Sequence, residues 1–208
     1  TVKGFTSPVF ALSQMPDGQL LIGHGGGVTM YDSGGLRNYP LQGFEKRPAV
    51  YSFFPSSSGL WVGTSQGVWR SGKLVRRLTT AGGLPANVVR AIAPAPDGNL
   101  WLATPAGIAV VDENQLNVLA THQNPLLENA LCLQADSEGK MWVGTSNNGI
   151  LIWSPADSTW TQIDERHKFP HNNIRAFVRD NTGNMWAATS GGGVVRLVAQ
   201  NFKHYDRS

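Results

Sequence analysis

Charged residues are scarce in this sequence: Lys, Arg, Asp and Glu make up 15% of its 208 residues, against about 25% in an average globular protein. Cysteine is reduced to Cys132, which excludes an internal disulfide and leaves the cellular compartment open. No apolar run approaches the roughly 18 residues that a membrane helix needs. Because the chain also starts without an initiator Met or a secretory leader, we expect it to be processed or cut from a longer chain.

Basic residues are scattered along the sequence and form no cluster. The net charge is +3, and only Lys46-Arg47 and Arg76-Arg77 are adjacent pairs. Nucleic-acid binding needs basic side chains clustered on one face, so we expect no nucleic-acid partner. What the chain does have is turn formers and aromatic residues, with 24 Gly, 12 Pro and seven Trp in a sequence that is 41% hydrophobic. This composition favours short strands joined by tight turns and argues against a helical bundle.

A tryptophan motif recurs along the chain. Four copies are clear: LWVGTS at residues 60–65, LWLAT at 100–104, MWVGTS at 141–146 and MWAATS at 185–190. A weaker fifth copy, LLIGH at 20–24, has Leu21 in place of the Trp. The successive anchors lie 40, 40, 41 and 44 residues apart. A fixed period of this length indicates a repeat architecture.

The residues around each anchor repeat as well. A glycine turn precedes every anchor and a second one follows it, which predicts hairpins on both sides. Ten residues before the anchor the chain has mostly small residues: Ala11, Tyr51, Ala91, Cys132 and Ala176. Each unit therefore reads as four antiparallel strands whose two apolar faces must stack on neighbouring units. We predict an all-β fold, a β-propeller of four-stranded antiparallel blades over about 8–43, 44–81, 82–122, 123–166 and 167–208.

The sequence is compatible with two ways of arranging the five blades. Five units can form a closed five-blade ring or an arc of a seven-bladed propeller. In an arc, the outer faces of the first and last units would leave apolar residues unburied, and we expect these to include Phe10, Leu12, Phe177 and Val195. Two arcs would then meet face to face as a homodimer.

The repeat resembles that of the two-component regulator propeller family. Residues 83–112 carry the resemblance through Gly83, Leu84, Pro85, Asn87, Ile92, Asp97, Gly98, Leu100, Trp101, Thr104, Gly107 and Asp112. Residues 172–195 carry it again through Asn173, Phe177, Asp180, Gly183, Trp186, Thr189 and Gly193. The matching residues are structural and do not specify a ligand.

The resemblance implies a function and a location. Such blades form the periplasmic sensors of hybrid histidine kinases and of some diguanylate cyclases. The chain is accordingly expected to be a non-catalytic ligand-sensing module, periplasmic or extracellular, of a bacterial membrane-anchored signalling protein, and to need no cofactor. Its contact with a membrane would come only through other parts of the parent protein.

Several short motifs suggest an enzyme but occur in the wrong context. His24-Gly25-Gly26-Gly27 resembles a lipase oxyanion hole, and residues 63–67 (GTSQG) resemble a nucleophile elbow. Both need a strand-to-helix turn, whereas here both occupy the second turn of a unit. His167 and His171 have helical metal spacing but flank a Phe-Pro loop, so no metal site is expected. A hydrolase or lyase would rest on His24 and Glu128 alone.

Ligand contacts are expected where loops into the first strands and the second turns of the blades share one face. The candidate binding residues there are Arg47, Asn87, Arg90, Asn129, Asn173 and Arg175. Arg90 and Arg175 lie eleven residues before their anchors, where the other copies have Phe10, Val50 and Leu131. Two arginines at such positions favour a carboxylate or sugar-acid ligand, unless they pair with carboxylates between blades.

One alternative function remains at this stage. A five-bladed, lectin-like carbohydrate-binding protein would have one shallow site in each blade. Polar loop residues would then repeat in all five copies, which they do poorly, since His24 stands where the other copies have Thr. The expected ligand is in either case a small molecule or carbohydrate.

Overall fold

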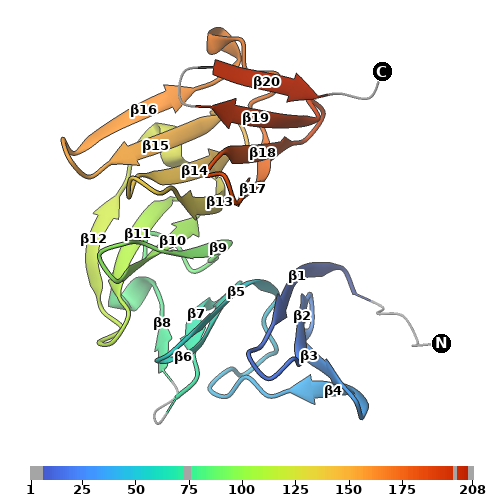
Figure 1. Cartoon of the computed structure of the whole chain (residues 1–208). Coiled ribbons are helices and arrows are strands. Elements are labelled where there is room, and N and C mark those ends of the chain that lie inside the picture. The colour runs from blue at the N-terminus through green and yellow to red at the C-terminus, as the bar shows by residue number, and fades with distance from the viewer. Residues whose placement is uncertain (1–6, 73–75, 199–200, 206–208) are drawn as a thin grey trace.

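The computed structural model describes residues 7–72, 76–198 and 201–205 (Figure 1). Within these residues, twenty strands form five separate antiparallel sheets of four strands each, in which neighbours in sequence are neighbours in the sheet. The predicted all-β propeller with four-stranded blades is therefore confirmed. Helical structure in the same residues is limited to the short 3-10 turns η1 (Thr80–Gly82), η2 (Pro125–Leu127) and η3 (Glu165–His167).

Each blade is a meander of consecutive strands. Blade 1 contains β1 (Val9–Gln14), β2 (Leu20–His24), β3 (Gly27–Asp32) and β4 (Gly35–Tyr39). Blade 2 contains β5 (Val50–Ser56), β6 (Gly59–Thr64), β7 (Gly67–Arg70) and β8 (Arg76–Leu78). Blade 3 contains β9 (Ala91–Pro94), β10 (Asn99–Thr104), β11 (Gly107–Asp112) and β12 (Val118–His122). Blade 4 contains β13 (Ala130–Ala135), β14 (Met141–Thr145), β15 (Ile150–Ser154) and β16 (Thr159–Ile163). Blade 5 contains β17 (Ile174–Arg179), β18 (Met185–Thr189), β19 (Val194–Val198) and β20 (Asn201–Tyr205).

The blades follow one another around an arc. Their first strands β1, β5, β9, β13 and β17 pack side by side in that order. Across the described residues, no comparable packing joins β17 back to β1, and Figure 1 shows blades 1 and 5 at the two ends of the arc. Of the two geometries that the sequence allows, the structure has the open one.

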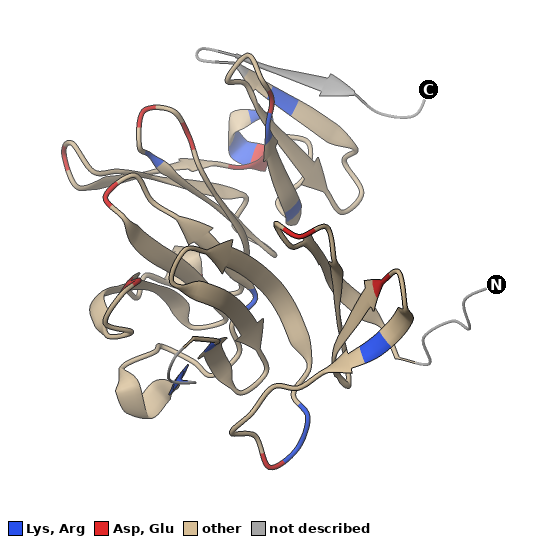
Figure 2. Ribbon diagram, turned by 60° about the horizontal axis from the view of Figure 1, so that its bottom comes forward, with Lys and Arg blue, Asp and Glu red and all other residues tan. Residues whose placement is uncertain are grey.

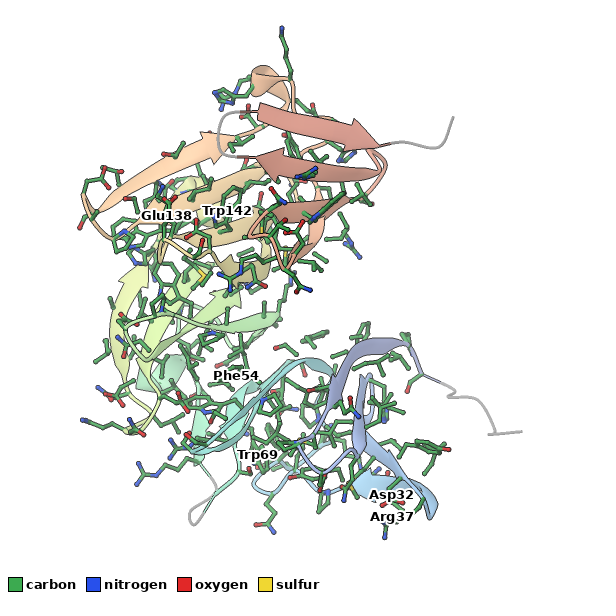
Figure 3. All side chains as sticks on the ribbon, in the orientation of Figure 1. Asp32, Arg37, Phe54, Trp69, Glu138 and Trp142 are labelled. Atoms are coloured by element: carbon green, nitrogen blue, oxygen red, sulfur yellow. The ribbon has the colours of Figure 1, made fainter. Side chains whose placement is uncertain are left out.

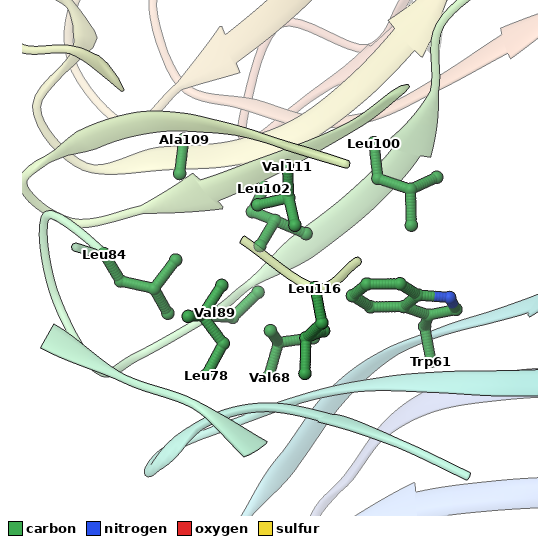
Figure 4. Packing of buried hydrophobic residues seen from close by; sticks show 10 residues of the cluster. All are labelled: Trp61, Val68, Leu78, Leu84, Val89, Leu100, Leu102, Ala109, Val111 and Leu116. Atoms are coloured by element: carbon green, nitrogen blue, oxygen red, sulfur yellow. The ribbon is translucent and has the colours of Figure 1, made fainter. Parts of the chain in front are cut away.

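Neighbouring blades are held together by the anchor tryptophans. Trp61 of β6 is completely buried and lies in one cluster with Leu100 and Leu102 of β10, as Figure 4 shows. Trp101 of β10 packs in the same way with Met141 of β14. Each anchor therefore faces the following blade, and the residues on either side of it face the preceding one, because side chains alternate along a strand. The prediction that these tryptophans serve blade-to-blade packing is confirmed.

In blades 2 to 5, a threonine at the end of the second strand fixes the turn that follows it. The Oγ1 atoms of Thr64, Thr104, Thr145 and Thr189 each donate to a glycine carbonyl at 2.7–3.0 Å. That glycine must lack a side chain: Gly107 has φ +124°, and an added Cβ would lie 2.4 Å from the His122 carbonyl oxygen. The Gly-Thr part of the motif is thus explained by turn geometry.

The two end faces of the arc expose apolar side chains. Leu12 is 65% exposed, as expected for an open arc. Phe10 is 48% exposed, as expected too, but its ring faces Tyr51 of blade 2, with centroids 5.2 Å apart. The expectation for Phe177 and Val195 is wrong, because both are buried against blade 4 in one cluster. Their neighbours Val178 (63% exposed) and Val194 (42% exposed) point the other way and form the free face of blade 5.

Charged residues are dispersed along the ribbon, as Figure 2 shows, without a stripe of one sign. The 3-10 turns of the described chain are far too short to cross a membrane, and no longer helix occurs there.

Candidate functional site

One rim of the arc gathers the loops that lead into the first strands and the second turns of the blades. Hydrogen bonds link these two sets of loops: Gly67 N donates to Asn87 O at 2.6 Å, and Gly149 N donates to Asn172 O at 3.0 Å. Asn129 N donates to Pro105 O at 2.9 Å in the next junction. Each loop is therefore joined to the second turn of the preceding blade, and the six candidate residues belong to this rim.

The three asparagines among the candidates hold the rim together. Asn87 Oδ1 accepts a hydrogen bond from Thr80 N at 2.9 Å. Asn129 has φ +55°, a left-handed conformation that Asn tolerates better than most residues. The Asn173 carbonyl oxygen accepts from Ser190 N at 2.9 Å, although its Oδ1 is buried without a hydrogen-bond partner. The Asn87 side chain and the backbone of the other two asparagines thus take part in the structure of the rim, which leaves the predicted ligand contacts untested.

The register of the first strands defines which positions are equivalent. In four blades the pairing of the first strand with the second shifts at one residue, which is left out of the ladder: Phe10, Tyr51, Leu131 and Arg175. Arg90 has the same place in blade 3, because Ala91 after it pairs with Ala103 as Ala176 pairs with Ala188. The equivalence of Val50 with the arginines is therefore wrong, and Tyr51 takes its place.

These five residues, Phe10, Tyr51, Arg90, Leu131 and Arg175, form what we call the axial row, since they start the innermost strands of successive blades. The two aromatic members, Phe10 and Tyr51, are in contact, with ring centroids 5.2 Å apart. The described residues contain no ion pair to Arg90 or Arg175. The alternative in which they pair with carboxylates between blades is therefore not realised there.

Arg47 lies apart from the axial row, beside a pocket of about 270 Å³ at blade 1. The pocket is bounded by the turn between β2 and β3, the end of β4 and the loop over residues 40–48. Tyr39 and Phe44 line it together with Asn38. By strand register Tyr39 has a counterpart in Tyr205 of blade 5, whereas Asn38 and Phe44 have none. The repeat pattern therefore does not identify the pocket, and the sequence signal was Phe44, two residues before Lys46-Arg47.

The residues of the motifs that resemble an enzyme make hydrogen bonds within turns and loops. His24 replaces the turn threonine, and its Nδ1 accepts from Gly26 N at 3.1 Å as the threonine oxygen does elsewhere. Ser65 Oγ accepts from Ala49 N at 3.1 Å and so helps to fix the loop into β5. Burial, and next the charge of Arg47, lower the pKa of His24. His24 in blade 1 and Glu128 before β13 lie in different blades and form no acid–base pair.

Other chemically active side chains have structural partners. His167 Nδ1 lies 2.9 Å from Asp164 Oδ1 in a capping box of η3, and His171 Nδ1 accepts from Asn173 N at 3.0 Å. Burial raises the pKa of the Cys132 thiol to about 12, which keeps it protonated and unreactive. The residues that the structure describes include no group of three side chains placed to hold a metal ion.

The geometry defines a class of protein, a β-propeller made by repetition of one blade. The family model of the two component regulator propeller matches residues 83–106, 126–147 and 168–191, which fall in blades 3, 4 and 5. These three blades carry the two component regulator propeller repeat. A comparison with curated proteins finds no match.

Solved structures show the same fold at low sequence identity. The extracellular domain of a hybrid two component system from B. thetaiotaomicron superposes with a TM-score of 0.81 at 22% identity, over 95% of this chain and 28% of that chain. The extracellular domain of a one component system from the same organism gives 0.80 at 18% identity, over 99% and 32% of the two chains. Virginiamycin B lyase from Staphylococcus aureus gives 0.77 at 16% identity, over 100% and 73%.

The chain thus spans less than a third of the length of the two extracellular domains. At these identities the likeness establishes the propeller fold and does not transfer an activity.

Proposed function

We propose that this chain is a non-catalytic, ligand-sensing propeller module of a bacterial membrane-anchored signalling protein, exposed to the periplasm or the cell exterior. Three blades carry the regulator repeat, and the similar extracellular domains belong to two component and one component systems. Although a lyase shares the fold, the rim described above has no acid–base cluster, which favours binding without turnover.

The observation that carries the proposal is the pair of arginines in the axial row. Arg90 and Arg175 occupy equivalent positions, have no carboxylate partner among the described residues and are separated by Leu131 of the intervening blade. Guanidinium groups bind carboxylates through paired hydrogen bonds. The ligand class is therefore a small carboxylate or sugar acid, the class that the two arginines in the sequence also favour.

The axial row does not favour the lectin-like alternative. Five equal sugar sites would need similar polar residues at all five positions, whereas the row contains two aromatic residues, a leucine and two arginines. The row is therefore suited to one asymmetric ligand.

Calorimetric titration with glucuronate, galacturonate and citrate tests this function, with glucose as the neutral counterpart. We expect saturable binding of at least one acid, and a loss of about tenfold or more in affinity for Arg90→Gln or Arg175→Gln, because a hydrogen bond to a charged group contributes about 1.5–3 kcal/mol. Arg179→Gln, on the same strand as Arg175 and exposed, is the matched control. Absence of binding, equal loss in the control, or consumption of the bound acid would contradict the proposal.

A further inference from the structure

The pocket at blade 1 is separate from the axial row and differs from it in chemistry. Most of its lining is apolar, with the Tyr39 and Phe44 rings, Val28 and Leu41 around the cavity. The polar side chains on its lining are those of Arg47, Asn38 and the Tyr39 hydroxyl. A cavity of about 270 Å³ lies just below the roughly 300 Å³ at which drug-sized sites begin, so it suits a molecule with a single ring.

The wall of the pocket that comes from residues 40–48 is fixed in place by blade 2. Trp69 of β7, labelled in Figure 3, is buried, and its Nε1 donates to Gln42 O at 3.0 Å. The Arg77 guanidinium lies 5.1 Å from the Phe44 ring centroid and donates to Gly43 O at 3.4 Å. A wall held in this way costs little ordering entropy when a ligand binds, and the pocket exists before a ligand arrives.

The charge at the pocket favours an anion. Arg47 is exposed, and it makes a long side-chain contact, 3.5 Å from Nη1 to Asn38 Oδ1. In the described part of the chain no carboxylate forms an ion pair with it. Its charge reaches the neighbouring turn, where it adds to the effect of burial in lowering the pKa of His24. Burial raises the pKa of Tyr39 above 10.0, so its hydroxyl stays a proton donor.

From these contacts we propose that the blade 1 pocket binds a small carboxylic acid with one planar ring. The ring packs against Tyr39 and Phe44, and the carboxylate pairs with the Arg47 guanidinium at the rim. An aromatic ring against aromatic walls is favoured over a polar sugar ring, because the lining offers few hydrogen-bond partners to hydroxyl groups. The site does not depend on the axial row or on its ligand.

Saturation-transfer NMR and calorimetry with benzoate and phenylacetate test the proposal, with benzamide as the uncharged counterpart of benzoate. We expect saturable binding of the acids, at least about tenfold weaker binding of benzamide, and a similar loss of benzoate affinity in Arg47→Gln. Because the Arg47 side chain is exposed, this variant should keep the fold, which circular dichroism verifies. Phe44→Leu, which keeps an apolar wall without the ring, should weaken benzoate without removing the charge effect.

Arg90→Gln is the control that separates the two sites. It should leave benzoate binding unchanged, just as Arg47→Gln should leave the binding of sugar acids unchanged. Lack of saturable benzoate binding overturns the proposal, and so does benzoate binding that is insensitive to Arg47→Gln. Loss of benzoate binding in Arg90→Gln would place the acid in the axial row and would also overturn it.

Discussion

At the scale of single residues, the turn threonines show how a repeated polar side chain becomes buried without penalty. Thr104 is fully buried, and its Oγ1 both donates to Gly107 O at 2.8 Å and accepts from Ala106 N at 3.3 Å. The hydroxyl therefore satisfies the Ala106 N–H inside the turn and adds a bond to the carbonyl of Gly107, which pairs with Thr104 in the ladder. His24 fulfils part of this role in blade 1 by accepting from Gly26 N.

We expect Thr104→Val to lower the free energy of unfolding by about 1–3 kcal/mol, because the shape is kept while Ala106 N loses its partner and the Gly107 carbonyl loses one of its bonds. Urea denaturation followed by tryptophan fluorescence measures the change. Thr121→Val, exposed on β12 of the same blade, should change stability by no more than about 0.5 kcal/mol. Equal effects of the two substitutions would show that the turn bonds contribute nothing.

His122 is the second residue whose surroundings determine its chemistry. Its ring stacks on Trp101, with centroids 5.1 Å apart, and lies 4.8 Å from Trp153 and 5.4 Å from Trp160. This aromatic cluster joins β10 and β12 of blade 3 to β15 and β16 of blade 4. Burial lowers the pKa of His122 below its ordinary 6.5, so the folded protein favours the neutral ring.

The sign of the pH effect follows from this shift. Well above pH 6.5 the ring is neutral in both states, and the full stability is present. As the pH falls below that value the unfolded chain takes up a proton more readily than the folded one, so the free energy of unfolding decreases. Denaturation at about pH 7.5 and about pH 5 should show a smaller decrease in His122→Phe than in the natural chain. Identical decreases would exclude His122 as a source, since His24 is common to both proteins.

At the scale of strands and blades, the sequence predicts much of the fold because every blade repeats the same contacts. The period, the two glycine turns and the anchor tryptophans were sufficient to predict five four-stranded sheets. The axial row was aligned correctly in four blades and incorrectly in blade 2. There Phe54 pairs with Trp61, seven residues on, whereas Ala93 pairs with Trp101, eight residues on.

The cause of this error is the hairpin between β5 and β6, which is one residue shorter than its counterparts. A signal was available, since Gly59 lies two residues before Trp61 while Gly98 lies three before Trp101. The pocket at blade 1 could not be predicted in this way, because the loop that forms it follows no repeat. Its shape depends on contacts with Trp69 and Arg77 of the next blade.

The junction between blades 2 and 3 allows a test of how strongly blades support each other. Leu102 is fully buried in the cluster that contains Trp61 and Val68 of the preceding blade. Leu102→Ala should destabilise the protein by about 2–5 kcal/mol, since it removes buried methyl groups and leaves a cavity between two sheets. Leu119→Ala, at a site that is 51% exposed, is the matched control, and chemical denaturation measures both. A loss below about 1 kcal/mol for Leu102→Ala would mean that the junction repacks freely.

At the scale of the whole molecule, the open arc has two different end faces. The face of blade 5 resembles the tryptophan side of every internal junction, and the face of blade 1 resembles the opposite side. Such faces complement each other head to tail, which makes the contact heterologous. Leu12 on one and Val178 on the other are the most exposed large apolar residues of the two faces.

We expect the isolated chain to associate with itself through these faces. Multi-angle light scattering should give a mass that rises with concentration above that of one 208-residue chain. The double variant Leu12→Lys, Val178→Lys should stay monomeric, since burying a lysine ammonium on either face is unfavourable. A natural chain that is monomeric at every concentration would contradict this expectation.

End blades have one neighbouring blade and internal blades have two, and this difference should set the order in which the blades unfold. In a linear array, the stability of each unit is its own folding energy plus the coupling to its nearest neighbours. Blades 2, 3 and 4 have two couplings, whereas blades 1 and 5 have one. Opening should therefore begin at both ends and move inward, so that amide hydrogens in β10 and β11 exchange last and those in β2 and β18 early. The free energy of local opening should therefore increase from both ends of the arc toward blade 3, which should be the last blade to open.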